Sequence, residues 1–372
     1  MKKIALATVA VAAAAALALS GCSSDRGAST GGSSEAAKGF AADSTIGVAL
    51  PDKTSENWVL AGSLFENGLK DAGYKGDVQY APASNTVAEQ QNQISAMVTN
   101  GAKVIVIGAK DGKQLGTQLQ QAADAGVKII AYDRLIENTP NVDYYVAFDN
   151  FKVGQLQGQA LLEGLEKRSG HAAPWNIELF SGSPDDANAA VFFNGAMDVL
   201  QPKIDDGTLV VKSGQTDVAQ TATQGWKAEN AQSRMDSLLT SNYSSDAIDG
   251  VLSPNDTLAR AIITSTKQAG KDISKVTVTG QDSEVESVKS IMAGEQYSTI
   301  NKDTTLLVEQ TIKMIGELQK GDEAEVNDTE QYDNGEKVVP AYLLAPVIVT
   351  KDNAAEAYKN NPNLLEIVNA AS

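Results

Sequence analysis

The stretch GAKVIVIGAKDGKQLGTQLQQAADAGVKIIAYDR, residues 101–134, decides the fold of this chain. Residues 104–107 and 129–131 are short apolar runs bounded by turn residues, which favours buried strands. Between them, residues 113–125 have the spacing of an amphipathic helix, and Gly126 follows where a helix C-terminal glycine belongs. A strand, a helix and a second strand in this order predict a right-handed parallel βαβ unit.

The same alternation continues from Thr45 through most of the chain. Gly73 and Gly101 end two further helical stretches in the way that Gly126 ends the first. We predict helices at 58–72, 87–100, 113–125 and 153–166, and strands at 46–50, 78–80, 104–107, 129–131, 144–147, 176–180, 209–212, 250–252, 276–279 and 297–300. Because two sets of about five strands fit two sheets better than one, the sequence predicts an α/β fold with two doubly wound parallel-sheet lobes.

The composition excludes several classes of function. The 372 residues include 47 acidic and 30 basic side chains, a formal charge of −17, and only one Cys and one His. The acidic excess argues against nucleic acid as a partner, because phosphate binding needs a concentrated basic surface. One Cys excludes a disulfide framework, and His171 alone leaves little room for a catalytic triad or a multi-histidine metal centre. We expect no catalytic residue, no metal and no cofactor.

The N-terminal residues predict export. Lys2 and Lys3 precede an apolar, alanine-rich run at residues 4–19, which predicts a signal peptide at 1–21. The sequence Leu-Ser-Gly-Cys that ends at Cys22 resembles the lipobox of bacterial lipoproteins, in which the Cys is acylated. We therefore predict a lipidated Cys22, a flexible tether to residue 43, and a location on the extracytoplasmic face of the cell membrane. An ordinary signal peptide with a chance Cys is the alternative.

Polar residues follow six of the predicted strands. They lie at 51–53, 132–134, 148–150, 181–188, 253–256 and 280–282. Ligands of such sheets bind at the carboxyl ends of the strands, so these clusters predict one polar site assembled from both lobes. Turn formation and helix capping explain many of the Asp and Asn residues, including one of Asp185 and Asp186, but they do not explain Arg134.

One further polar segment is interpreted differently. Residues 108–113, GAKDGK, follow a strand and precede a helix, as a phosphate-binding loop does. The segment is one residue short between its glycines, and Gln114 stands where Ser or Thr would bind Mg²⁺. The sequence therefore argues against nucleotide binding.

Residues 45–352 resemble the periplasmic sugar-binding proteins of ABC importers, in particular the branch that binds xylose or several monosaccharides. The segments that carry the resemblance are 131–134 (AYDR), 148–150 (FDN), 182–189 (GSPDDANA), 280–282 (GQD), 293–299 (AGEQYST), 326–329 (VNDT) and 334–340 (NGEKVVP). They keep the family's order over nearly the whole mature chain.

The resemblance implies a type I periplasmic binding protein, with two lobes joined by a three-segment hinge that close on one sugar. It predicts crossings near Asn150, Gln281 and Asp328. The first lobe would then comprise residues 44–150 and 282–328, and the second would comprise 151–281 and 329–372.

The resemblance also implies the ligand-binding residues. Carboxylates and cationic or amide groups pair with sugar hydroxyls, and indole rings pack on the C–H faces of a pyranose. The residues are Trp58, Asp133, Arg134, Asn188, Trp226, Asn255, Asp256, Asp282 and Lys302. This chain has Asn57 where close relatives tend to carry Arg before the tryptophan. Lys53 then has two open roles, either supplying the missing charge as a ligand-binding residue or being simply solvated.

The expected function is capture of a monosaccharide of the xylose, glucose, galactose or arabinose class and its delivery to an ABC permease driven by its ATPase. We expect a monomer that catalyses nothing. A sugar sensor that reports occupancy to a receptor kinase or chemoreceptor would share every site residue, so it remains an alternative. A carbohydrate-active enzyme is the other rival, and it would need separated carboxylates around the site.

Overall fold

The computed structural model describes residues 39–53, 55–82 and 87–371. The predicted signal peptide, the lipidated Cys22 and most of the predicted tether lie outside these residues. None of the helices in the described ranges combines the length and apolarity that crossing a membrane requires.

The first lobe is built on a six-stranded sheet in the order β11-β5-β4-β3-β1-β2, in which every pair is parallel. In the register, Val48 of β1 lies opposite Val78 of β2 and Val106 of β3. Its elements are β1 (Thr45–Leu50), α1 (Glu56–Asp71), β2 (Lys75–Tyr80), α2 (Ala88–Thr99), β3 (Val104–Ile107), α3 (Gly116–Asp124), β4 (Lys128–Tyr132), β5 (Tyr144–Phe148), α10 (Thr304–Lys320) and β11 (Ala341–Leu344).

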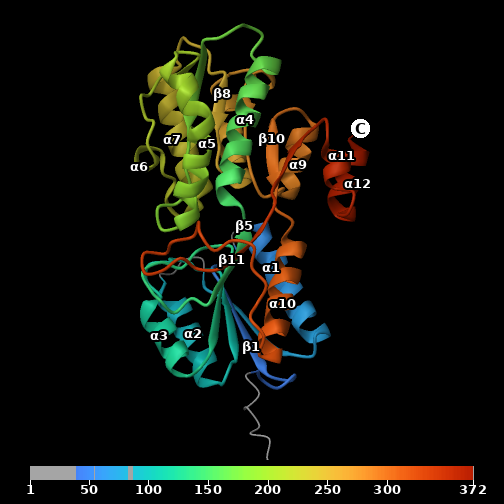
Figure 1. The fold of residues 1–372 in the computed structure, drawn as a ribbon. Coiled ribbons are helices and arrows are strands. Elements are labelled where there is room, and N and C mark those ends of the chain that lie inside the picture. Colours follow the sequence, from blue (N-terminus) through green and yellow to red (C-terminus); the bar gives the residue numbers. More distant parts are fainter. Residues whose placement is uncertain (1–38, 54, 83–86, 372) are drawn as a thin grey trace, which may run out of the picture. The chain divides into compact units, whose positions relative to one another are not determined.

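Both faces of this sheet are covered by helices, as Figure 1 shows. Ile105 and Ile129 face α2 and α3, where they pack with Ile94. The alternate residues, such as Val106, face α1 and α10 and pack with Phe65. Because successive side chains of a strand point to opposite faces, strands buried on both sides need the continuous apolar runs seen in the sequence.

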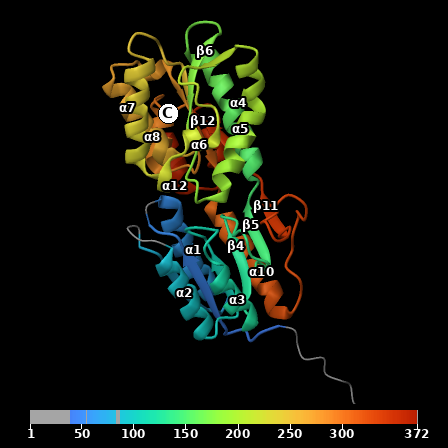
Figure 2. The ribbon, with the colours of Figure 1, turned by 90° about the vertical axis from the view of Figure 1, so that its left-hand side faces the viewer.

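The second lobe contains a four-stranded parallel sheet in the order β7-β6-β8-β9 and a two-stranded antiparallel sheet of β10 and β12. In Figure 2, α4 and α5 lie on one side of the larger sheet and α7 and α8 on the other. Its elements are α4 (Asn150–Arg168), β6 (Trp175–Leu179), α5 (Ala187–Asp205), β7 (Leu209–Val211), α6 (Val218–Thr221), the 3₁₀ turn η1 (Gln224–Trp226), α7 (Ala228–Asn242), β8 (Gly250–Leu252), α8 (Asp256–Gln268), the 3₁₀ turn η2 (Ile273–Lys275), β9 (Thr277–Val278), α9 (Val285–Met292), β10 (Ser298–Asn301), β12 (Val347–Thr350), α11 (Ala354–Ala357) and α12 (Pro362–Ala370).

The predicted fold class is confirmed, and so are the helix-ending glycines. Gly73, Gly101 and Gly126 have φ values of 87°, 82° and 71°, directly after the C-caps of α1, α2 and α3. This left-handed conformation is nearly free of strain only for glycine, which explains the sequence signal.

The strand pairing contradicts part of the predicted lobe boundaries. The chain passes from β5 to α4 at Asn150, where a crossing was predicted, but the other two crossings lie between β10 and α10 and between β11 and β12. The segments 282–301 and 329–344 therefore lie in the opposite lobes to those predicted. The sequence prediction omitted β11 and β12, and it placed the β10 segment in a parallel sheet although β10 pairs antiparallel with β12.

The predicted tether also ends earlier than residue 43. The amide of Phe40 donates to the carbonyl of Gln319 at 3.1 Å, and its ring lies 6.5 Å from the ring of Tyr74. Phe40 is the one large apolar residue in a stretch of small ones, and packing it against α10 buries surface that Ser and Gly cannot offer.

Candidate functional site

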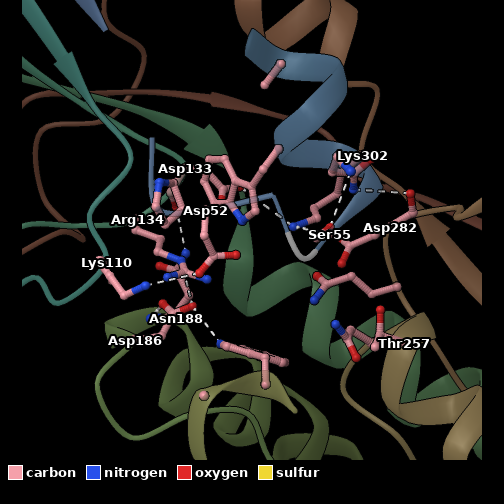
Figure 3. A pocket seen from close by; sticks show the side chains of 18 of the residues that line it. Asp52, Ser55, Lys110, Asp133, Arg134, Asp186, Asn188, Thr257, Asp282 and Lys302 are labelled. Carbon is pink, nitrogen blue, oxygen red and sulfur yellow. Dashed lines mark hydrogen bonds and ion pairs between the residues drawn. The ribbon is translucent and has the colours of Figure 1, made fainter. Parts of the chain in front are cut away.

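A cavity of about 810 Å³ is lined by residues of both lobes at the carboxyl ends of the parallel strands. Figure 3 shows charged and amide side chains converging on it from several elements. Eight of the ten ligand-binding residues predicted from the sequence line the cavity. They are Trp58, Asp133, Arg134, Asn188, Trp226, Asn255, Asp282 and Lys302.

Arg134 is held at the end of β4 by three contacts. Its Nε lies 3.0 Å from Oδ2 of Asp186, and its Nη1 donates to the carbonyl of Ala109 at 3.1 Å. Its guanidinium also lies 5.3 Å from the ring centroid of Trp58. The side chain is only 15 % exposed, and these contacts hold its planar guanidinium in place at the cavity wall.

The carboxylate of Asp186 contacts three site residues, which are Asn188 and Trp226 of the second lobe and Arg134 of the first. Its carboxylate caps α5 by accepting from the amide of Asn188 at 3.0 Å, pairs with Arg134, and accepts from Nε1 of Trp226 at 3.1 Å. Burial raises the pKa of this carboxyl, although Arg134 opposes the shift. The sequence indicated a capping role only. The pairing with Arg134 depends on how the two lobes meet, which the sequence does not reveal.

Lys302 lies between two carboxylates at the crossing from β10 to α10. Its Nζ is 3.1 Å from Oδ1 of Asp282 and 3.8 Å from Oδ1 of Asp133, and the side chain is 10 % exposed. Burial alone would lower the pKa of Lys302, but Asp282 and Asp133 raise it above its usual value. Lys302 is therefore a cation at neutral pH, and its Nζ also lies 5.5 Å from the ring of Phe192.

A buried hydrogen-bond network ties the two lobes together beside these ions. Nδ2 of Asn188 donates to the carbonyl of Asp133 at 2.6 Å, and the hydroxyl of Tyr145 donates to the same carbonyl at 2.7 Å. Asn150, at the first crossing, donates to the Tyr145 hydroxyl at 3.2 Å. Burial raises the pKa of Tyr145 well above its usual value, so the hydroxyl keeps its proton and remains a donor.

Each lobe supplies one indole ring, and each ring packs over a glycine that follows a strand. A Cβ on Gly108 would lie 2.9 Å from Cζ3 of Trp58, and a Cβ on Gly182 would overlap the ring of Trp226. Only glycine leaves room for the two rings at these positions. The sequence predicted both tryptophans through the resemblance, but the glycines beneath them follow from the tertiary structure.

Three non-glycine residues of the site have positive φ. They are Asp133 at 61°, Trp226 at 54° and Asp282 at 97°. Such conformations are costly for residues with a Cβ and persist where the surrounding structure imposes them, often at functional sites. Here they turn three predicted ligand-binding side chains into the cavity.

The structure does not bring Lys53 or Asp256 to the cavity wall. Lys53 is exposed, with its Nζ 4.6 Å from the ring centroid of Tyr80, which corresponds to the solvated alternative. Asp256 is fully buried and accepts from Gln296, Thr299 and the amide of Glu284 at 2.8–3.0 Å. These bonds give Asp256 a structural role, at the start of α8.

Asn57 lines the cavity and also contacts the backbone of the second lobe. Its Nδ2 donates to the carbonyl of Asp282 at 3.3 Å, and its Oδ1 accepts from the Thr304 hydroxyl at 3.5 Å. The amide therefore joins α1 to the backbone of Asp282 and to Thr304 at the start of α10.

Several other residues of the wall were not among the predicted ligand-binding residues. Asp52 and Lys110 form an ion pair there, with Oδ2 and Nζ 3.3 Å apart, and Thr257 and Gln281 line the opposite lobe. Asp52 and Lys110 both follow strands of the first sheet. Asp52 belongs to the polar cluster 51–53 that the rule of ligand binding at strand carboxyl ends assigned to the site. Lys110 also follows a strand, but its segment was interpreted only as a defective phosphate loop.

The arrangement suits a neutral, polyhydroxylated ring. Carboxylates and cations alternate around the cavity, so a hydroxyl can donate to one and accept from the next. The two indoles offer apolar faces. Over the described ranges, no group of three or more His, Cys, Asp or Glu side chains could hold a metal ion.

Comparison with known proteins agrees with this chemistry. The family of the periplasmic binding protein domain matches residues 46–323. The chain is 51 % identical over 321 residues to the multiple sugar-binding periplasmic receptor ChvE of Rhizobium radiobacter, covering 85 % of this chain and 90 % of that protein. It is 35 % identical over 308 residues to the D-xylose-binding periplasmic protein of Escherichia coli, covering 83 % and 87 %. An ABC transporter solute-binding protein of Clostridium phytofermentans, solved with bound β-D-glucose, has 43 % identity and a TM-score of 0.81, covering 86 % and 99 %.

Proposed function

The chain belongs to the periplasmic binding protein family, and on this premise we propose that it captures a monosaccharide outside the cytoplasm and delivers it to an ABC importer. One observation carries the proposal. The cavity combines an indole ring from each lobe with alternating carboxylates and cations, and it draws its lining from both lobes. A pyranose needs these groups, because its hydroxyls both donate and accept while its C–H faces are apolar.

Binding to both lobes at once gives the protein a way to signal that it is loaded. A sugar held by Arg134 and Trp58 from the first lobe and by Asn188 and Trp226 from the second favours the arrangement in which the lobes approach each other. The closed form would present one rim from each lobe to the permease. Asn255 uses its Oδ1 to cap α8, which leaves its Nδ2 group for the sugar.

Three relatives support a sugar of the xylose or glucose class. One relative binds multiple sugars, another D-xylose, and a solved relative holds β-D-glucose. We propose that this chain takes a monosaccharide of the xylose, glucose, galactose or arabinose class and catalyses no reaction on it. Incubating the protein with these sugars and analysing the mixture should return them unchanged.

Isothermal titration calorimetry tests the binding function. D-xylose, D-glucose, D-galactose and L-arabinose are titrated into the purified protein, with L-glucose as the control ligand. We expect at least one D-sugar or L-arabinose to bind in the micromolar range, about −8 kcal/mol, and L-glucose to release no binding heat. Absence of binding by all four sugars would contradict the proposal.

We also propose that acylated Cys22 anchors the protein to the membrane and that it acts as a monomer beside a permease and its ATPase. Cys22 is the only cysteine of the chain and follows an apolar, alanine-rich segment. The substitution Cys22→Ala should move the protein from the membrane fraction to the medium. Light scattering of the purified protein should give the mass of one chain.

A further inference from the structure

We propose that Asp52 and Lys110 bind the sugar and select it through one of its hydroxyl groups. The proposal rests on the function proposed above, because it assigns two further residues to the same site. In Figure 3 the pair lies on the side of the site away from Lys302 and Asp282. The cavity therefore has charged groups at both sides.

The Asp52–Lys110 pair lies on the cavity wall, within reach of a ligand but largely shielded from bulk water. Both side chains line the cavity, and only 16 % of Lys110 and 18 % of Asp52 is exposed. A largely buried ion pair contributes little to stability, because removing two charges from water costs about as much as their attraction returns. A ligand hydroxyl that bonds to both groups would add to their contacts and make this placement favourable.

The backbone that carries Lys110 is fixed by a buried glutamine. Nε2 of Gln90 donates to the carbonyls of Ala49 at 3.3 Å and Gly108 at 2.8 Å, and its Oε1 accepts from the amide of Lys110 at 2.8 Å. Gln90 is fully buried, so these bonds tie the ends of β1 and β3 together without competition from water. The segment that resembled a defective phosphate loop is thus a rigid part of the cavity wall.

Residues 108–113 also position Arg134, which is already assigned to the site. The carbonyl of Ala109 accepts from Nη1 of Arg134 at 3.1 Å. Lys110 follows directly, so its side chain and the Arg134 guanidinium belong to one connected part of the wall. In Figure 3 Arg134 lies beside Asp52 and Lys110, so a sugar that pairs with Arg134 would be near this ion pair.

The chemistry of the pair fits a neutral hydroxyl better than an anion. The ammonium of Lys110 has three donors, and its partners among the described residues are Asp52 at 3.3 Å and the carbonyl of Pro82 at 3.0 Å. A hydroxyl can accept from Lys110 and donate to the Asp52 carboxylate. A phosphate or carboxylate group would meet the negative charge of Asp52 beside the lysine, which disfavours it.

Calorimetry with deoxy sugars tests the assignment. The parent sugar is the one of the four sugars that binds the wild type most tightly. This sugar and its monodeoxy derivatives are titrated into the wild-type protein, Lys110→Met and Lys113→Met. We expect one deoxy derivative to bind the wild type about 10- to 100-fold more weakly than its parent sugar, since removing the hydroxyl removes its hydrogen bonds to two charged groups. In Lys110→Met the affinity for the parent sugar should fall by a similar factor. In this variant the same deoxy derivative should bind less than about threefold more weakly than the parent sugar.

Lys113→Met is the matched control. Lys113 lies in the same segment, but its side chain is 53 % exposed and pairs with Glu137 at 3.8 Å. This variant should keep the wild-type pattern of affinities. If Lys110→Met does not fold in a thermal melt, Asp52→Asn takes its place, since it keeps the shape of the side chain and removes the charge.

The outcomes separate this inference from the proposed function. If the wild type binds none of the four sugars, the function and the inference both fail. If the wild type binds and every deoxy penalty is the same in the wild type and in the folded variant, sugar binding stands and the assignment of Asp52 and Lys110 is wrong.

Discussion

Gly182→Ala tests whether the indole of Trp226 must lie where the structure has it. The added Cβ would overlap the six-membered part of the Trp226 ring, well inside the ordinary carbon–carbon separation of about 3.5 Å. The obstacle is a rigid ring and not the flexible end of a side chain. The ring must therefore move away from Gly182 by roughly 1 Å or more, and its 3.1 Å bond to Asp186 is lost.

The cost to sugar binding has two parts. Stacking on an aromatic ring contributes about 0.5–1.5 kcal/mol beyond buried area. Asp186 also holds Arg134, and a weakened hydrogen bond from that guanidinium to the sugar is worth about 1.5–3 kcal/mol. Together these predict a loss of roughly 2–4 kcal/mol, or about 30-fold or more in affinity.

The assay is calorimetry with the sugar that binds the wild type most tightly. Tryptophan fluorescence provides a second readout, because Trp58 and Trp226 both line the cavity and Trp175 is buried elsewhere. Gly116→Ala is the matched control, since the nearest atom to its added Cβ is 3.9 Å away. Sugar affinity within twofold of wild type in Gly182→Ala would refute the reasoning, provided the variant is folded.

Three further predictions concern other groups. Arg134→Ala should abolish the rise in Tm that sugar produces, and it should lower the Tm of the free protein because Asp186 loses its cation; an unchanged rise would remove Arg134 from the site. Asp256→Ala should destabilise the fold by about 3 kcal/mol or more, since three buried donors lose their acceptor, while the sugar Kd of the folded protein changes less than about threefold. A weaker Kd with an unchanged Tm would instead support ligand binding by Asp256. The neighbouring backbone carbonyl and Asp249 raise the pKa of His171 in the folded state, so its stabilising contribution is present below the usual pKa of about 6.5 and is lost as pH rises through the folded value. The Tm difference between wild type and His171→Gln should accordingly be larger at about pH 5.5 than at about pH 8.5, and an equal difference at both would contradict it.

The sequence predicted the α/β class and most of the strands because these depend on local patterns. Runs such as residues 104–107 are apolar throughout, and Gly73, Gly101 and Gly126 mark helix ends through a backbone conformation that favours glycine. The order of strands within the sheets does not follow from such patterns. β11 is four residues long and lies far along the chain from β5, its partner, so its place in the first sheet is decided by pairing between distant segments.

The candidate site, too, could be predicted only in part from the sequence. Arg134 at a strand end was conspicuous in the sequence, because it is neither a turn former nor a helix cap, and the resemblance selected Trp58 and Lys302. Residue type and order therefore sufficed to predict a polar site of both lobes. They could not separate Asp256, whose carboxylate is turned inward to three buried donors, from Asp282, which faces the cavity.

The sequence by itself determined which chemistry this protein carries: paired charges, amides and indoles, with too few His and Cys residues for most metal or catalytic centres. The tertiary structure alone decided which of those groups meet. Asp186 reaches Arg134 across the two lobes, Asp52 reaches Lys110 across two strands, and Gly182 makes room for a ring 44 positions later in the chain. The physical reason is that an ion pair or a ring contact is set by distances of a few ångströms in space, and separation along the chain carries almost no information about those distances.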